Sequence, residues 1–229
     1  MTLVLLIRHA HSSANATGVL SGQKSGVHLS EIGRKQAVNL ASRMGAFSVK
    51  ALRSSPLERC EETIAPWVKK FGATTEIEID RDLVEMDYGS WSGRKLRSLA
   101  KEPLWKTVQT QPSRVVFPDG EGMAVMQARA IGALYRALER PGKGHVLLIS
   151  HGDIIKSLIA SSLGMHLDEF QRFVVDPASI SLLDFSQSKP RLLLMNDSRS
   201  NINELLVHDH SKRKLVGGGA GLTAKKGRT

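Results

Sequence analysis

Short apolar runs alternate with amphipathic stretches along most of the chain. Runs rich in aliphatic and β-branched residues occupy 3–9, 49–55 and 145–150, a composition typical of buried strands. Each run is followed by a stretch whose apolar residues recur every three or four positions, which is typical of a helix. Strands that alternate with helices predict a largely parallel sheet with helices on both faces. The expected fold class is therefore α/β, a three-layer α/β/α sandwich.

The ends of the expected helices carry recognisable signals. Ser30 is placed to cap the first long helix at its N-terminus, and Gly45 is placed to end it. Ser55 is placed to cap the second helix, with Pro56 at its first helical position. The helices expected on these grounds cover residues 30–45, 56–72, 119–142 and 151–164.

The C-terminal part of the chain makes the sheet mixed. Residues 75–80 alternate between polar and apolar, as a half-buried strand does. Two later strands, 179–185 and 191–196, are joined by a short polar segment and are expected to form a hairpin. We find no repeat and no linker before residue 211. The prediction is one domain over 1–210, followed by a basic, glycine-rich tail over 211–229.

Charge is concentrated in that tail. The formal net charge is +10, and the tail contributes six basic residues and no acidic ones. The first 210 residues hold 26 basic and 22 acidic residues, which does not favour a nucleic-acid partner. Cys60, the single cysteine, excludes an internal disulfide and favours a cytoplasmic location. No signal peptide, membrane span or membrane partner is expected, because the first apolar run is short and has no basic segment before it.

Polar side chains follow three of the expected strands. Arg8, His9 and His11 end the first strand. Arg59 lies about one helical turn after the strand at 49–55, and His151 directly follows the strand at 145–150. Ligands of open α/β sheets bind outside the carboxyl ends of the strands. These side chains are therefore expected to converge on one site.

Such a set of residues favours phosphate chemistry. Arginines grip a phosphate through paired hydrogen bonds, and helix N-termini add backbone donors. A neutral histidine can attack phosphorus, and a second histidine, if protonated, stabilises the transferring oxygens. The leaving oxygen needs a proton. Glu85 is a candidate donor, because the apolar residues beside it would raise its pKa.

Six segments resemble the motifs of the histidine phosphatase superfamily, the phosphoglycerate mutase-like proteins. In the order in which that family has them, they are LLIRHAHSSAN (5–15), HLSEIGRKQA (28–37), SSPLERCEET (54–63), LVEMDYGSWSG (83–93), FPDGEGMAVMQAR (117–129) and LLISHGDIIKSLIA (147–160). The resemblance covers residues 3 to about 185. It is strongest to a group of actinobacterial proteins labelled phosphomutases.

The resemblance implies a phosphoglycerate mutase-like fold, a covalent phosphohistidine, and neither a metal nor another cofactor. Three residues would be catalytic: His9 as the nucleophile, Glu85 as the proton donor and later the base, and His151 as a group that holds the phosphate. The substrate-binding residues would be Arg8, Asn15, Arg59 and Gly152. The partner expected is a small phosphorylated metabolite, and a homo-oligomer is compatible with these features.

The chain departs from the family at two positions. Ala10 stands where the family most often has glycine, and His11 stands where glutamate, glutamine or threonine is usual. Position 11 lines the substrate side in the family, so His11 bears on substrate preference. The segment after Glu85 is shorter than that of the glycolytic mutases, which favours a metal-independent phosphomonoesterase over a phosphomutase.

Two further interpretations remain open. His9 and His11 lie two apart on a strand, so they would face the same way and could ligate the metal of a metal-dependent hydrolase. The pocket could also belong to a non-catalytic binder of a phosphorylated ligand. Of the other residues, Met123 and Met126 are expected in the core or the pocket wall. His145 is expected far from the site. Tyr88 and Trp91 are candidates to line it.

Overall fold

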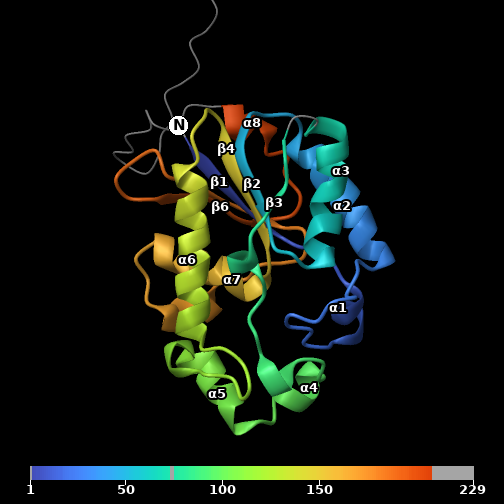
Figure 1. The fold of residues 1–229 in the computed structure, drawn as a ribbon, viewed down its shortest axis with the longest axis vertical. Helices are drawn as coiled ribbons and strands as arrows, with labels where there is room; N and C mark the ends of the chain where they lie inside the picture. The colour runs from blue at the N-terminus through green and yellow to red at the C-terminus, as the bar shows by residue number, and fades with distance from the viewer. Residues whose placement is uncertain (1, 73–74, 208–229) are drawn as a thin grey trace, which may run out of the picture.

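Six strands of the described residues form one mixed sheet between two layers of helices in the computed structural model (Figure 1). The structure describes residues 2–72 and 75–207. The order of the strands is β3-β2-β4-β1-β5-β6; β1 to β4 run parallel, and β5 and β6 pair antiparallel at one side. The predicted α/β class and the mixed sheet are thus confirmed. The predicted tail, 211–229, lies outside the described residues, and the single domain over 1–210 stays a prediction.

The strands are short and the helices of ordinary length. The strands are β1 (Leu3–Arg8), β2 (Val49–Ser54), β3 (Glu78–Ile79), β4 (His145–Ser150), β5 (Ile180–Asp184) and β6 (Arg191–Asp197). The helices are α1 (Ser13–Thr17), α2 (Glu31–Met44), α3 (Glu58–Phe71), α4 (Leu96–Leu99), α5 (Pro103–Thr110), α6 (Met123–Glu139), α7 (Gly152–Ser162) and α8 (Asn203–Val207).

Strand β1 shows why both faces of the sheet are covered. Leu3, Leu5 and Ile7 join the core that α2 and α3 complete, whereas Val4 and Leu6 join the core that α6 and α7 complete. Successive side chains of a strand point to opposite faces, so a strand between two helical layers must be apolar throughout. All five side chains are fully buried or nearly so. The sheet is therefore the centre of a sandwich with one apolar core on each face.

The signals at the first long helix are confirmed. The Ser30 hydroxyl accepts a hydrogen bond from the Gly33 N–H at 3.1 Å, as a helix cap does. Gly45 follows the last helical residue with a φ of 63°, a left-handed conformation that glycine adopts without strain.

The signals at the second helix were wrong. Helix α3 begins at Glu58, so Pro56 precedes it, and no side chain caps it. The Ser55 hydroxyl lies 2.7 Å from His151 Nε2 instead. The local sequence assigned this hydroxyl to the start of the helix, but it contacts a histidine 96 positions away instead.

The remaining elements differ from the predictions mainly in length. The strand expected over 75–80 is reduced to β3. The helix expected over 119–142 is α6, and it begins late because Asp119 takes a left-handed turn with a φ of 59°. The hairpin is confirmed as β5 and β6. Among the helices of the described part of the chain, none combines the length and the apolar character that crossing a membrane requires.

Residues 94–118, for which the sequence suggested no element, contain α4 and α5. Both helices lie at the bottom of Figure 1, beyond the carboxyl end of β1. Trp105 of α5 stacks on Trp91, with the ring centroids 6.2 Å apart and the planes 22° apart. This segment therefore forms a cap over the end of the sheet where the polar strand ends lie.

Candidate active site

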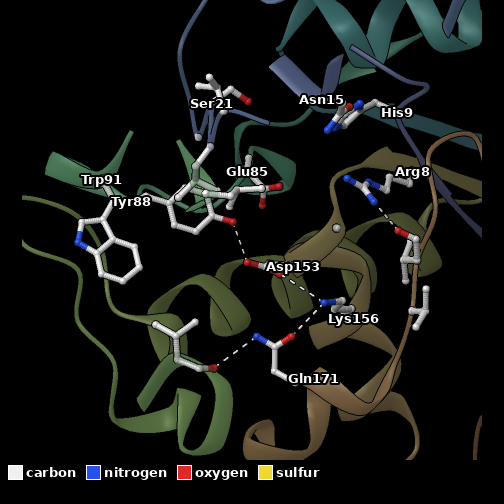
Figure 2. A pocket seen from close by; sticks show the side chains of 18 of the residues that line it. Arg8, His9, Asn15, Ser21, Glu85, Tyr88, Trp91, Asp153, Lys156 and Gln171 are labelled. Carbon is white, nitrogen blue, oxygen red and sulfur yellow. Dashed lines mark hydrogen bonds and ion pairs between the residues drawn. The ribbon is translucent and has the colours of Figure 1, made fainter. Parts of the chain in front are cut away.

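A cavity of about 500 Å³ opens at the carboxyl ends of the parallel strands. Figure 2 shows Arg8, His9 and Asn15 on one side of it, and Tyr88 and Trp91 across from them. The residues predicted from the strand ends and the family motifs that line the cavity are Arg8, His9, Asn15, Arg59, Glu85 and Gly152. The structure thus brings together side chains that the sequence spreads over more than 140 positions. Tyr88 and Trp91 line the cavity, as predicted.

His9 is held in one orientation. Its Nδ1 atom lies 2.8 Å from the carbonyl oxygen of Ala10. A carbonyl can only accept, so the proton sits on Nδ1 and Nε2 carries a free lone pair. Burial lowers the pKa of His9 well below its usual value, and the charges of Arg59 and Arg8 lower it further. The ring is therefore a neutral imidazole with a nucleophilic nitrogen.

His151 lies behind His9, with the two ring centroids 5.2 Å apart. It is fully buried and is not among the residues that line the cavity. Burial lowers the pKa of His151 well below its usual value, and Arg59 and His9 add to the shift. The sequence left the protonation of this ring open, and these surroundings favour the neutral form in the ligand-free protein.

Four buried donor atoms on three of these residues have no partner within the described part of the chain: Arg8 Nε, Arg59 Nε, Arg59 Nη1 and His151 Nδ1. The guanidinium groups are nevertheless fixed. Arg8 Nη1 donates to the Val175 carbonyl at 2.5 Å, and Arg59 Nη2 donates to the Gly22 carbonyl at 2.8 Å. Leaving a buried donor unpaired costs about 1–3 kcal/mol. A cluster of such donors beside a neutral histidine is a site built for an anion.

Asn15 and Gly152 add two further donors. The Asn15 Oδ1 atom accepts hydrogen bonds from the Ser12 N–H at 3.0 Å and from the Ser12 hydroxyl at 2.9 Å, which leaves Nδ2 for a ligand. Gly152 is the first residue of α7, so its N–H belongs to a helix N-terminus, where anions are favoured. A Cβ at this position would lie 3.7 Å from the Arg8 guanidinium.

Glu85 is the acidic group of the site. Burial raises its pKa to about 7, and the negative charge of Asp153 contributes. Asp153 accepts a hydrogen bond from the Tyr88 hydroxyl at 2.7 Å, and Figure 2 shows these residues facing the cavity from one side. A carboxyl group with this pKa carries a proton for part of the time at neutral pH and can both give and take one.

A partly buried ion pair holds the backbone around Glu85. Arg129 of α6 donates to the carbonyl oxygens of Asp82, Val84 and Glu85 at 2.7–3.1 Å. Glu121 pairs with the same guanidinium at 2.5 Å and accepts the Asp87 N–H at 2.9 Å. Both residues lie in the FPDGEGMAVMQAR segment. The motif signalled them, but their positioning role needed the three-dimensional contacts.

The two departures from the family pattern are accommodated locally. The Ala10 methyl is fully buried in a small cluster with Leu29, and its N–H donates to the Thr63 hydroxyl at 2.8 Å. His11 turns to Ser30, with Nδ1 2.8 Å from the hydroxyl, and is not among the residues that line the cavity. The expectation that position 11 lines the substrate side does not hold here.

No group of three or more metal-ligating side chains is found in residues 2–72 and 75–207. His9 and His11 are thus not part of such a group, and their Nδ1 atoms face Ala10 and Ser30. A metal-dependent hydrolase would need at least one more ligand beside this pair, and the described residues do not supply one.

Several residues of the cavity were missed from the sequence. Lys156 lies one helical turn after Gly152 on α7, and its Nζ lies 3.1 Å from Gln171 Oε1 and 3.9 Å from Asp153 Oδ1. Asp176 lines the mouth. No local signal marks these positions, because each looks like an ordinary surface residue of a helix or loop. By contrast, the residues expected to be structural are so: Cys60, Met123 and Met126 are fully buried, and His145 binds the Leu206 carbonyl away from the cavity.

Comparison with known proteins agrees with this geometry. Residues 4–198 match the model of the histidine phosphatase superfamily, branch 1. The phosphoserine phosphatase 1 of Hydrogenobacter thermophilus is 30% identical over 213 residues, which cover 92% of this chain and 99% of that protein. A protein named probable phosphoglycerate mutase GpmB, from Cronobacter sakazakii, is 31% identical over 191 residues, covering 82% of this chain and 87% of that protein.

The fold also matches solved structures. The alpha-ribazole phosphatase of Shigella flexneri superposes with a TM-score of 0.76 at 26% identity, covering 87% of this chain and 98% of that one. The phosphoglycerate mutase-like architecture expected from the motifs is thus confirmed. The resemblance to an actinobacterial sub-group stays a prediction.

Proposed function

The chain belongs to the histidine phosphatase superfamily, branch 1, and from that premise we propose that it is a metal-independent phosphomonoesterase acting through a phosphohistidine on His9. The observation that carries the proposal is the juxtaposition at His9. A neutral ring with a free Nε2 atom lies among buried arginine and histidine nitrogens that have no partner within residues 2–72 and 75–207. Its substrates are small phosphate monoesters.

In the first step, Nε2 of His9 attacks phosphorus and the bond from phosphorus to the ester oxygen breaks. Arg8, Arg59 and the N–H of Gly152 hold the phosphoryl oxygens, where negative charge is redistributed in the transition state. Protonated Glu85 gives its proton to the leaving oxygen, so that the alcohol departs neutral. A raised pKa suits Glu85 to this role, since it keeps the acid form populated near neutral pH.

In the second step, water replaces the histidine. The Glu85 carboxylate takes a proton from water as the water oxygen bonds to phosphorus, and the bond to Nε2 breaks. His9 recovers its lone pair, Glu85 recovers its proton, and inorganic phosphate leaves. The same carboxyl group thus acts as acid and then as base. His151 contributes Nδ1–H as a neutral donor to the phosphoryl group.

Two alternatives share the site. A phosphomutase would transfer the phosphoryl group back to an acceptor alcohol instead of to water, and the relative from Cronobacter sakazakii supports it. The relative from Hydrogenobacter thermophilus supports the phosphatase, over nearly the whole chain. A non-catalytic binder would need the donors alone, whereas Glu85 adds an acid with a raised pKa, which turnover requires.

The test is hydrolysis of an aryl phosphate with EDTA present, with wild type compared with His9→Ala. Wild type should release phosphate, whereas His9→Ala should lose activity at least a thousandfold while still folding, because no other group takes the phosphoryl. Protein quenched in alkali should carry alkali-stable, acid-labile phosphate on His9. Turnover in the variant would contradict the phosphohistidine. Phosphorylation from a phosphoglycerate without net hydrolysis would favour the mutase, and binding without phosphorylation the binder.

We also propose a cytoplasmic location, which the presence of a single cysteine, Cys60, supports, because a chain with one cysteine has no internal disulfide. Cell fractionation tests it. Assembly into a homo-oligomer stays a prediction, which light scattering of the purified protein tests.

A further inference from the structure

We propose that the substrate carries a bulky aromatic leaving group, which α5 and its neighbours hold in the half of the cavity away from His9. This inference rests on the proposed phosphatase function and deepens it. It is based on three features of the cavity: its size, the side chains that line it, and the balance of charge beyond the phosphate-binding donors.

The cavity is larger than a phosphate and a short chain need. Its volume of about 500 Å³ falls within the range of roughly 300–1,000 Å³ that is typical for ligands of drug size. Figure 2 shows Arg8, His9 and Asn15 at one end of the cavity only. The rest of the volume is available to the alcohol part of the ester.

Aromatic side chains line much of that remaining volume. We call them the aromatic wall: Tyr88, Trp91, Trp105, Phe117 and Phe173. Four of them support one another, since Trp91 stacks on Trp105, and Phe117 meets both Trp91 and Tyr88 edge to face at 5.1–5.2 Å. Tyr88, Trp91 and Phe117 are almost completely buried behind the surface, whereas Trp105 is partly exposed. A pre-formed aromatic surface binds a flat ring at little cost in side-chain entropy.

The charges beyond the phosphate-binding end disfavour a second anion. Apart from the phosphate-binding arginines and Glu85, the charged side chains among the described residues that line the cavity are Lys156, Asp153 and Asp176. Lys156 is already engaged, with Gln171 at 3.1 Å, Asp153 at 3.9 Å and the Phe170 ring centroid at 5.4 Å. A leaving group with its own carboxylate, as in a phosphoglycerate or phosphoserine, would meet the Asp153 carboxylate here, and Lys156, the cation beside it, is already paired with that carboxylate. An uncharged aromatic alcohol avoids that repulsion.

The test compares esters of similar chemical reactivity but different size. Phenyl phosphate and 2-naphthyl phosphate have leaving groups of nearly equal acidity, so the ratio of their kcat/KM values reports binding of the second ring. 3-Phosphoglycerate is the small anionic ester. Wild type, Trp105→Ala and Tyr135→Ala are compared; Tyr135 lies on α6, is 52% exposed and is not among the cavity residues.

We expect wild type to prefer 2-naphthyl over phenyl phosphate about tenfold, since the added ring buries apolar area against the wall. 3-Phosphoglycerate should be the poorest of the three. Trp105→Ala should reduce the preference to about twofold, and Tyr135→Ala should keep it. A ratio near one in wild type, or 3-phosphoglycerate as the best substrate, would overturn the inference.

Calorimetry of ester binding to His9→Ala measures the same preference in the absence of turnover. Tighter binding of 2-naphthyl than of phenyl phosphate, and weakest binding of 3-phosphoglycerate, would support the aromatic pocket even if wild type failed to hydrolyse any ester. In that case the proposed function alone would fail. The reverse order of affinities would overturn the pocket assignment while hydrolysis by wild type left the phosphatase intact.

Discussion

The hydroxyl of Ser55 lies 2.7 Å from Nε2 of His151, and the two groups share a hydrogen bond. The Leu57 N–H donates to the Ser55 oxygen at 3.4 Å, so the serine proton is free to be donated to Nε2. We infer that Ser55 donates to Nε2, which places the histidine proton on Nδ1, the buried ring nitrogen that has no partner among the described residues. Ser55 is thus a positioning residue that prepares His151 to donate to a phosphoryl group.

Replacing Ser55 should therefore slow phosphorylation. Ser55→Ala should lower kcat about tenfold, the equivalent of one lost hydrogen bond of about 1–1.5 kcal/mol, with KM changed less than twofold. The ¹⁵N chemical shifts of His151 should move from the Nδ1–H form toward a mixture, and Ser55→Thr should restore them. Ser157→Ala is the control, since its buried hydroxyl donates to the Ile154 carbonyl. Unchanged ¹⁵N shifts in Ser55→Ala would refute the role.

Arg129 should be essential to the position of Glu85 rather than to phosphate binding. Arg129→Lys keeps the charge but cannot reach three carbonyl oxygens and Glu121 together. We expect kcat to fall at least tenfold, the inhibition constant of inorganic phosphate to change less than twofold, and the free energy of unfolding to fall by about 2–4 kcal/mol.

Arg136→Lys is the matched control for Arg129→Lys. Arg136 lies on the same helix and pairs with Asp80 and Asp82, but its side chain is 46% exposed. Arg136→Lys should lower the free energy of unfolding by less than about 1 kcal/mol and keep kcat within twofold of the wild-type value. An equal fall in phosphate affinity and kcat for Arg129→Lys would instead assign Arg129 to the phosphate site.

The pH dependence of kcat/KM should report Glu85. Phosphorylation needs its acid form, so kcat/KM should decline as the pH rises through about 7, the value to which burial and then Asp153 raise the Glu85 pKa. The other charges that act on Glu85, those of Arg59 and Arg8, lower it. Asp153→Asn removes a negative charge, so the declining limb should move to lower pH.

Tyr88→Phe is the control for that experiment, because it removes the hydrogen bond to Asp153 and keeps the negative charge. The declining limb should then not move to lower pH. The same ester is used for all proteins, so the ionisation of the substrate cancels. A limb that stays in place in Asp153→Asn would show that Glu85 is not the acid of the first step.

Most of the proposed catalytic residues could be predicted from the sequence, but few of the other residues that line the cavity could. Arg8, His9 and His151 could be predicted because they follow apolar strands directly, and parallel strands end at the same edge of a sheet. Trp105 could not, since α5 lies in a short segment that neither strand spacing nor a long helical period marks. The partner of Ser55 could not either, because a hydroxyl serves a nearby helix end and a distant ring equally well.

Two helical glycines should respond oppositely to alanine. A Cβ at Gly33 of α2 would lie 1.9 Å from the His11 carbonyl oxygen, so Gly33→Ala should cost about 3 kcal/mol or more and should reduce activity by displacing the segment that holds His9. A Cβ at Gly132 of α6 would meet only the end of the Arg136 side chain at 3.2 Å. Gly132→Ala should stabilise the protein by about 0.5–1 kcal/mol, as urea unfolding can measure.

Glu85 should reduce stability at alkaline pH, because the site that raises its pKa also penalises its charge. Its folded pKa of about 7 exceeds the value of 4.5 for a free glutamate, so the native state binds the proton more tightly. Stability then falls as the pH rises from about 4.5 to 7, by roughly 3 kcal/mol at most, and stays low above that range.

Glutamine mimics the protonated acid without titrating. Glu85→Gln should therefore exceed wild type in free energy of unfolding by roughly 2–3 kcal/mol at pH 8 and equal it at pH 4.5. Glu31→Gln, at a carboxylate 76% exposed, should change stability by less than about 0.5 kcal/mol at both values. A gain for Glu85→Gln of the same size at both pH values would mean that packing rather than charge burial separates the two side chains. A gain confined to pH 8, in a variant that has lost the proton donor, would show that the acid needed for turnover is kept at the expense of stability.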